Sequence, residues 1–177
     1  MNCYVQAPRI LLGNGDVLEN SGILIHDGTI AQIGGSPSLP EGTTILSLEN
    51  GTLMPGFIDS HSHAGEDSCR EEGISQQHLQ PDGRKALRGL MSLQKDLRAG
   101  TTTIRLLGDG FGMVDKQLRE AVQAGEVQGP HILACCMALR PSCGTSPEIA
   151  YAADGVDEVR RRVREAVFAG ADVIKLF

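Results

Sequence analysis

The stretch Leu53–His63, with the sequence LMPGFIDSHSH, decides how this chain is interpreted. Pro55-Gly56 separates it from the preceding segment, and Phe57–His61 is expected to form a short strand. Side chains alternate between the two faces of a strand, so His61 and His63 point the same way. Two imidazoles on one face at a strand end can share a metal ion such as Zn²⁺, Fe²⁺ or Ni²⁺. Two polar surface residues at a strand end would give the same spacing, so other features must decide between these interpretations.

Residues 1–54 have the pattern of a small β domain. Asp27-Gly28 lies between two strand-like runs, residues 22–26 and 29–33, and Asp-Gly supplies the positive φ values of a tight hairpin turn. Further short strands are expected over residues 17–19, 43–48 and 52–54. We therefore predict that residues 1–54 form a small sheet, a portion of a β-sandwich, whose open edges must be covered from elsewhere.

Residues 55–177 change to an alternation of strands and helices. Strands are expected over residues 57–61, 101–107, 131–137 and 171–177, helices over 84–99, 114–124 and 156–169, and long loops over 64–81 and 142–154. This order predicts an α/β fold with a parallel sheet and right-handed crossovers. A helix–glycine–strand phrase recurs at residues 98–101 and 168–171, which indicates a repeated βα unit, as in a barrel.

The composition excludes several classes of protein. The net charge of −6 offers no basic footprint for nucleic acid, so no nucleic-acid partner is expected. The five cysteines lack the spacing of a disulfide framework, and no apolar run approaches the roughly 18 residues of a membrane span. The N-terminus lacks the charged and apolar regions of a signal peptide. The expectation is a cytoplasmic protein without membrane contact.

The stretch Leu53–His63 resembles the signature of the amidohydrolase superfamily. Residues 99–105, 129–134 and 169–176 are similar to the second, third and fourth barrel strands of that family, most of all to its imidazolonepropionase-like and prolidase-like branch. The resemblance implies a small β-sandwich followed by a (β/α)₈ barrel of TIM type, with the first four strands in residues 55–177. The implied activity is hydrolysis of amide-like or peptide-like carbon–nitrogen bonds through a metal-activated hydroxide.

The resemblance also implies roles for three residues and a class of substrate. His61 and His63 would bind the first metal ion, and Lys175 would be carboxylated and bridge two ions, expected to be Zn²⁺. Burial disfavours the charged form of a lysine, and a neutral amine can take up CO₂ as a carbamate. A lysine that extends its ammonium to solvent from a strand end is the alternative interpretation. The substrate would be a small or dipeptide-like molecule.

Part of the family's site has no counterpart in this chain. In the family, two further histidines and an aspartate that acts as base come from later barrel strands, so no catalytic residue is expected within this chain. His26, His78 and His131 are expected to be structural or solvent-exposed, although His78 could line a pocket from the loop after the first strand. Leu106 and the segment Ser142–Thr145 differ from what relatives often carry there, which leaves the substrate open.

Two other functions remain open at this point. Half a barrel exposes strand edges and an apolar interior, so the chain could be a binding or assembly module that forms homo-oligomers to cover them. A deaminase of the same superfamily usually uses a single metal ion without the bridging lysine, so Lys175 argues against that activity.

The native protein is predicted to be larger than this chain. A barrel needs about 250 residues, and residues 55–177 provide about half of them, so the 177 residues alone should be unstable and inactive. The intact mass of the protein in its source checks this expectation and should far exceed 18.8 kDa. A native mass of 18.8 kDa, with a cooperative monomeric melt and zinc-dependent amidase activity, would contradict it.

Overall fold

The computed structural model describes residues 1–35, 37–67 and 71–177, so Cys69 lies outside the described residues. The chain divides into two compact units, Met1–Pro55 and Gly56–Phe177. The cysteines at positions 3, 135, 136 and 143 are free thiols. In the described ranges no helix combines the length and the apolar character that crossing a membrane requires.

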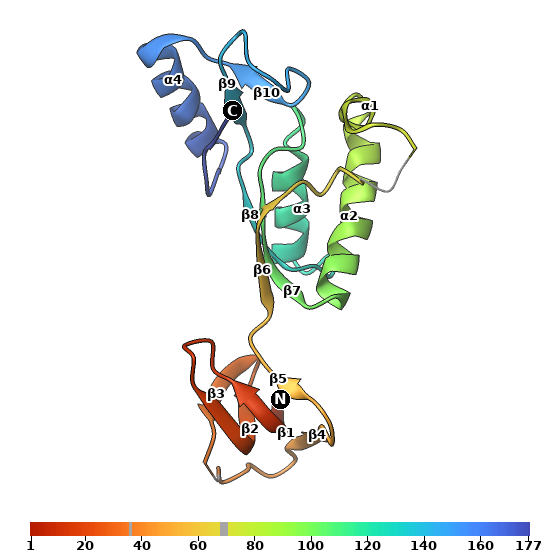
Figure 1. Cartoon of the computed structure of the whole chain (residues 1–177), viewed down its shortest axis with the longest axis vertical. Coiled ribbons are helices and arrows are strands. Elements are labelled where there is room, and N and C mark those ends of the chain that lie inside the picture. Colours follow the sequence, from red (N-terminus) through yellow and green to blue (C-terminus); the bar gives the residue numbers. More distant parts are fainter. Residues whose placement is uncertain (36, 68–70) are drawn as a thin grey trace. The chain divides into compact units, whose positions relative to one another are not determined.

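The first unit is a single mixed sheet of five strands (Figure 1). The strands are β1 (Asn2–Leu11), β2 (Val17–His26), β3 (Thr29–Ile33), β4 (Thr44–Ser47) and β5 (Thr52–Leu53). The order is β3-β2-β1-β4, and β5 also pairs with β1. Asp27 (φ 47°) and Gly28 (φ 75°) form the turn between β2 and β3, which confirms the hairpin predicted from Asp-Gly. The described residues of this unit make one layer, and the sandwich stays a prediction.

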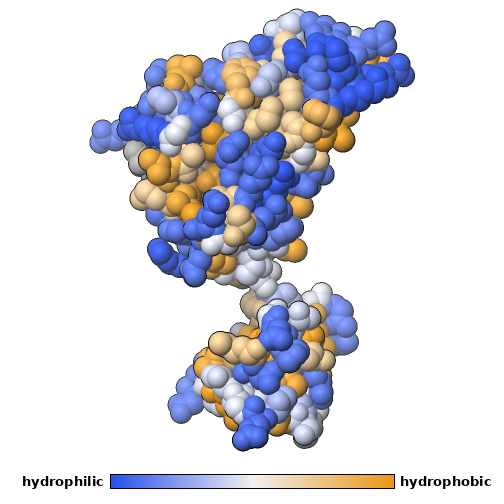
Figure 2. All heavy atoms as spheres, turned by 180° about the vertical axis from the view of Figure 1, so that it is seen from behind, coloured by the Kyte–Doolittle hydropathy of each residue, from blue (hydrophilic) through white to orange (hydrophobic). Residues whose placement is uncertain are grey.

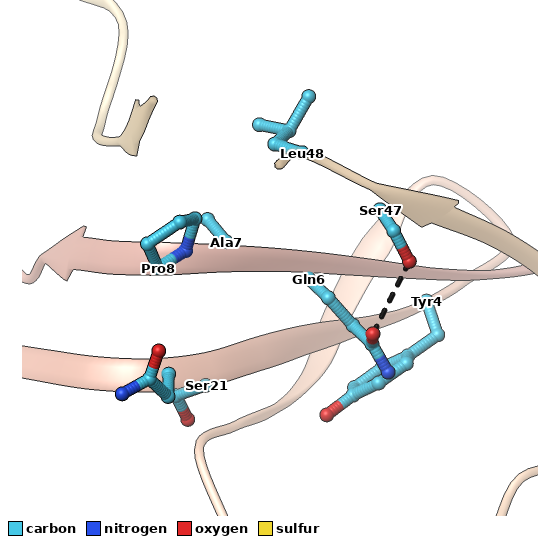
Figure 3. A pocket seen from close by; sticks show the side chains of 8 residues that line it. Tyr4, Gln6, Ala7, Pro8, Ser21, Ser47 and Leu48 are labelled. Atoms are coloured by element: carbon cyan, nitrogen blue, oxygen red, sulfur yellow. Dashed lines mark hydrogen bonds between the residues drawn. The ribbon is translucent and has the colours of Figure 1, made fainter. Parts of the chain in front are cut away.

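Strand β1 was not predicted, because its polar residues and Pro8 interrupt the pattern that indicates a paired strand. Pro8 has no N–H to donate, and the register of β1 with β2 skips it, passing from Ala7 opposite Ser21 to Arg9 opposite Glu19. The parallel partner of β1 also changes there, from β4 to β5. Beside this break lies a hollow of about 310 Å³, lined by Tyr4, Gln6, Ala7, Pro8, Asn20, Ser21, Ser47 and Leu48 (Figure 3).

The second unit alternates parallel strands with helices, as predicted. Its elements are β6 (Phe57–Ser62), α1 (Ile74–His78), α2 (Asp82–Arg98), β7 (Thr101–Leu106), α3 (Val114–Gln123), β8 (His131–Ala134), β9 (Ala138–Arg140), β10 (Ala150–Ala152), α4 (Gly155–Phe168) and β11 (Lys175–Leu176). One parallel sheet has the order β6-β7-β8, and a second has the order β10-β9-β11. Helix α1 and strand β10 lie in segments that were predicted to be loops.

The strand predicted over residues 131–137 is interrupted after Ala134, so this part of the prediction was wrong. Cys136 adopts a left-handed conformation with φ 59°. Its backbone N–H donates to Oδ2 of the buried Asp115 at 2.8 Å instead of to a neighbouring strand. The chain then resumes as β9, which pairs with β11.

The last predicted strand, residues 171–177, is also shorter than expected. Only Lys175–Leu176 is a strand, and the residues before it are held by a side chain. The carboxylate of Asp172 accepts from the backbone N–H of Ala134 at 2.9 Å and from the guanidinium of Arg119 at 2.5 Å. The backbone N–H of Asp172 donates in turn to the carbonyl of Ala134 at 2.8 Å. This segment therefore runs beside the end of β8, as the next parallel strand would.

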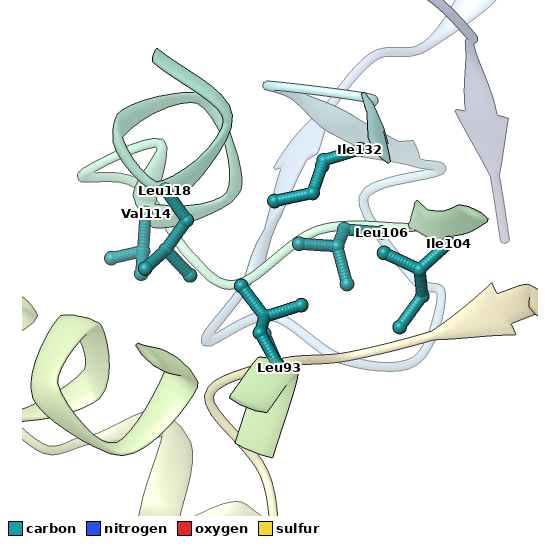
Figure 4. Packing of buried hydrophobic residues seen from close by; sticks show 7 residues of the cluster. Leu93, Ile104, Leu106, Val114, Leu118 and Ile132 are labelled. Atoms are coloured by element: carbon teal, nitrogen blue, oxygen red, sulfur yellow. The ribbon is translucent and has the colours of Figure 1, made fainter. Parts of the chain in front are cut away.

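The core of the second unit lies between the sheet and two helices (Figure 4). It contains Ala64, Leu93, Ile104, Leu106, Val114, Leu118 and Ile132. Helices α2 and α3 cover the face of the sheet that carries Ile104, Leu106 and Ile132. Strand β6 is covered far less: it has one strand partner among the described residues, and Ile58 is 73% exposed. Apolar side chains are visible at the surface in Figure 2.

Leu93 and Leu87 provide a matched pair of substitutions on helix α2. Leu93 is fully buried, whereas Leu87 is 69% exposed. Leu93→Ala is expected to lower the free energy of unfolding by about 2–5 kcal/mol, because it removes packed methyl groups and leaves a cavity. Leu87→Ala should change it by less than about 0.5 kcal/mol. Urea denaturation measures both, and equal effects of the two changes would contradict this packing.

Candidate metal centre

The two histidines of the opening motif lie side by side at the end of β6. Ser62 pairs with Leu106, whose side chain is buried in the core under α2 and α3. The register between β6 and β7 shifts between Asp59 and Ser62, so the simple alternation of faces does not hold along this stretch. The ring centroids of His61 and His63 are 5.5 Å apart, with an angle of 53° between the ring planes. The two imidazoles are neighbours at this strand end, and their common face stays a prediction.

The ring of His63 is held by the loop that follows β7. Its Nδ1 lies 2.7 Å from the carbonyl oxygen of Gly108 and donates to it, so the neutral ring presents an unprotonated Nε2. A ligating histidine commonly donates its other ring N–H in this way, which fixes both the tautomer and the ring orientation. The His63 side chain is only 18% exposed. The hydrogen bond from Nδ1 to Gly108 leaves Nε2 free to bind a metal ion, so His63 fits the role of a ligand.

A carboxylate lies between His63 and His78, the histidine that could line a pocket from a loop. Glu66 Oε1 lies 2.5 Å from Nε2 of His78 and 3.5 Å from Nδ1 of His63. His78 is the last residue of α1, and its side chain is 10% exposed. A polar hollow of about 310 Å³ adjoins this group, lined by Ser62, His63, Ala64, Glu66, Asp67, Ser92, Lys95 and Asp96.

Two aspartates and a lysine buried behind the histidines were missed by the sequence analysis. Burial, and after it the neighbouring Asp115, raises the pKa of Asp109 to about 6. Burial likewise raises the pKa of Asp115. Lys85 Nζ donates to the backbone carbonyl of Asp109 at 3.0 Å and pairs with Asp82 at 2.6 Å. The available signal was the phrase Gly108-Asp109-Gly110, in which an acidic residue stands between two glycines directly after a strand.

Lys175 lies on β11, next to residues that follow β8 in the chain. It pairs with Ala138, and a Cβ atom placed on Gly108 would lie 3.1 Å from the Cβ of Ala138. Gly108 in turn accepts from His63, so successive strand ends connect His63 with Lys175. The Lys175 side chain is partly buried, and its Nζ lies 4.7 Å from the centre of the Phe177 ring.

The structure thus brings His61 and His63 together and places Lys175 on a different strand end. Within the described ranges, no group of three histidine, cysteine, aspartate or glutamate side chains is arranged to hold a metal ion. His26 lies in β2 and contacts Asn2 at 2.6 Å, and His131 is exposed at the start of β8, as expected for residues outside the site.

The model of the amidohydrolase family matches residues 52–177. Ochratoxinase from Aspergillus niger is 28% identical over 97% of this chain and 41% of its own length. Imidazolonepropionase from Klebsiella pneumoniae is 30% identical over 78% of this chain and 40% of its own length. A crystal structure of a prolidase complexed with N-methylphosphonate-L-proline is 29% identical, with a TM-score of 0.82 over 99% of this chain and 46% of that chain. This chain therefore spans less than half the length of these relatives.

The carboxyl group of Asp109 should make stability depend on pH. Its pKa is raised from 3.8 to about 6, so the folded state holds a proton that the unfolded state releases. That contribution is complete below pH 3.8 and is lost as pH rises to about 6, a difference of about 3 kcal/mol. Asp109→Asn has no such proton, so it should gain stability relative to the unchanged protein across this range. Urea denaturation of the metal-free protein at pH 4 and pH 7 measures the difference, and a constant difference would contradict it.

Proposed function

Because this chain belongs to the amidohydrolase family, we propose that it provides part of the metal centre of a hydrolase that acts on carbon–nitrogen bonds. His61 and His63 would be two ligands of a divalent cation, expected to be Zn²⁺. The observation that carries the proposal is the placement of the two rings 5.5 Å apart at the end of a parallel strand, with Nδ1 of His63 bound to Gly108. The C-terminal ends of parallel strands are where barrel enzymes place their active sites.

The proposed fold is the first half of a (β/α)₈ barrel in residues 55–177, preceded by a portion of a β-sandwich in residues 1–54. Strands β6, β7 and β8 are consecutive parallel strands, and helices α2 and α3 cover the outward face. Residues 171–176 lie next to β8 and β9 as the fourth strand would. The five-stranded sheet of the first unit would be one layer of the sandwich.

Lys175 is proposed to be carboxylated and to bridge two metal ions. Its supports are its partial burial and its position on the strand end next to Ala138 and Gly108, on the way to His63. A carbamate would replace the contact of the lysine with the ring of Phe177 by contacts with the ions. When bound, the metal ions would act as Lewis acids that polarise the scissile carbonyl and lower the pKa of water.

The two histidines and Lys175 are an incomplete set of ligands for two ions, since zinc sites usually take four ligands each. We therefore propose that further ligands and the catalytic base lie outside the described residues, and that the 177 residues alone are inactive. The substrate would be a small or dipeptide-like molecule with an amide-like bond. The relatives named ochratoxinase, imidazolonepropionase and prolidase fit this class by their names.

A second candidate function rests on the exposed side of β6. Phe57 and Ile58 are 57% and 73% exposed on a strand that is paired on one side among the described residues. A module that assembles with another chain through this edge would cover both residues. If the unchanged protein binds no zinc in the experiment below but forms a stable oligomer, this second function is favoured.

Metal binding should depend on His61 and His63 and not on an exposed histidine elsewhere. His61→Ala and His63→Ala are each expected to weaken zinc binding by at least about 100-fold, since each removes a ligand. His131→Ala should bind zinc as the unchanged protein does, because His131 is exposed at the opposite end of its strand. Chelator competition and metal analysis measure affinity and stoichiometry. Hydrolysis of a panel of N-acyl amino acids and dipeptides measures activity, which the 177 residues alone are expected to lack.

Lys175→Met tests the bridging role separately. It should reduce the zinc content of the protein and abolish the carbamate signal that the unchanged protein gives with ¹³C-labelled bicarbonate. Unchanged zinc binding in both histidine variants would refute the metal centre. A missing carbamate signal in the unchanged protein would refute only the role of Lys175.

A further inference from the structure

The loop after β7 contacts the end of β6 at two points that flank Ala64. The carbonyl of Gly108 accepts from Nδ1 of His63 at 2.7 Å. The next residue, Asp109, accepts the backbone N–H of Gly65 on its Oδ1 at 3.0 Å. One contact holds the ring of the histidine, and the other holds the backbone two residues further on. Together they restrict both the rotation of the ring and the course of the chain that carries it.

The loop formed by residues 108–110 is also held in place by a contact with helix α2. Gly108 and Gly110 have φ values of 105° and 104°, which side chains with a Cβ rarely adopt. Lys85 of helix α2 reaches across and donates to the carbonyl of Asp109, and its side chain is 6% exposed. A Cβ on Gly110 would lie 2.6 Å from Nζ of Lys85. The loop therefore has little room to move away from β6.

Among the described residues, only one carboxylate oxygen of Asp109 has a hydrogen-bond partner. Oδ1 accepts from Gly65, whereas Oδ2 is buried and has no hydrogen-bond partner. Asp109 is 3% exposed, and a buried polar atom without a partner destabilises the fold. An asparagine would keep the acceptor on the used side and avoid burying a charge. An alanine would remove the acceptor and leave the N–H of Gly65 unpaired.

We propose that Asp109 is a positioning residue for the metal-binding His63, acting through its hydrogen bond to Gly65 and the adjacent Gly108 contact, so that Nε2 of the ring faces the metal ion. The inference rests on the proposed function. The required feature is an acceptor at the Oδ1 position, since that oxygen makes the contact with Gly65.

Zinc affinity in the full protein, measured by chelator competition, tests this role with three variants. Asp109→Ala is expected to weaken binding by about 10–100-fold, and Asp109→Asn should stay within about threefold of the unchanged protein, because only the first removes the acceptor. Asp157→Ala is the control, since that side chain is fully exposed on α4. Unchanged affinity in Asp109→Ala would overturn the proposal. Equal weakening in Asp109→Ala and Asp109→Asn would also overturn it, because charge and not the acceptor would then matter.

His63→Ala distinguishes a failure of the proposed metal centre from a failure of the positioning role of Asp109. If His63→Ala binds zinc as the unchanged protein does, the proposed metal centre is wrong and the role of Asp109 falls with it. If His63→Ala loses binding while Asp109→Ala keeps it, the metal centre stands and only the positioning role is wrong.

Spectra of the unchanged protein keep the proposal testable if the alanine variant does not fold. Asp109→Leu fills the space without supplying an acceptor and is the first replacement for the alanine variant. In the metal-free unchanged protein, long-range ¹H–¹⁵N spectra should show His63 protonated on Nδ1 and unprotonated on Nε2. Hydrogen exchange of the Gly65 amide should be slowed. A proton on Nε2 or a rapidly exchanging Gly65 amide would overturn the inference.

Discussion

The packing of Ile104 and Leu106 under helices α2 and α3 is the constraint on which the candidate site depends. These side chains decide which face of the parallel sheet is closed to water. Because Ser62 is in register with Leu106, the same packing fixes the position of the strand end that carries His61 and His63. The hydrophobic core therefore selects the geometry of the polar site without touching it.

Much of the architecture could be predicted because it has a local signal. The Asp27-Gly28 hairpin, strand β3 and the three long helices follow from turn chemistry and periodicity, and each helix is followed within two residues by a glycine. The proximity of His61 and His63 follows from their spacing of two residues at a strand end. Each of these features is set by residues close together in the chain.

Features that the sequence could not reveal depend on contacts between distant residues. The interruption after Ala134 needs the carboxylate of Asp115, about twenty residues earlier, to capture the N–H of Cys136. The short last strand needs Asp172 to bond Ala134 and Arg119. The burial of Asp109 and Lys85 is equally invisible, since charged residues are expected at the surface. Side-chain contacts with a distant backbone leave no periodic trace in a sequence, and they are the contacts that shape the strand ends here.

The two adjacent thiols behind the strand ends have a consequence for metal selectivity. Thiolates are soft ligands that compete well with imidazole for zinc and copper, so a cysteine near a histidine site can divert the ion. The sulfur of Cys135 would lie 3.6 Å from a Cβ on Gly108, close to the loop that holds His63. Burial raises the pKa of Cys136 to about 11 and raises that of Cys135 further. In the metal-free protein both groups therefore remain protonated thiols at neutral pH, which makes them poor targets for oxidants.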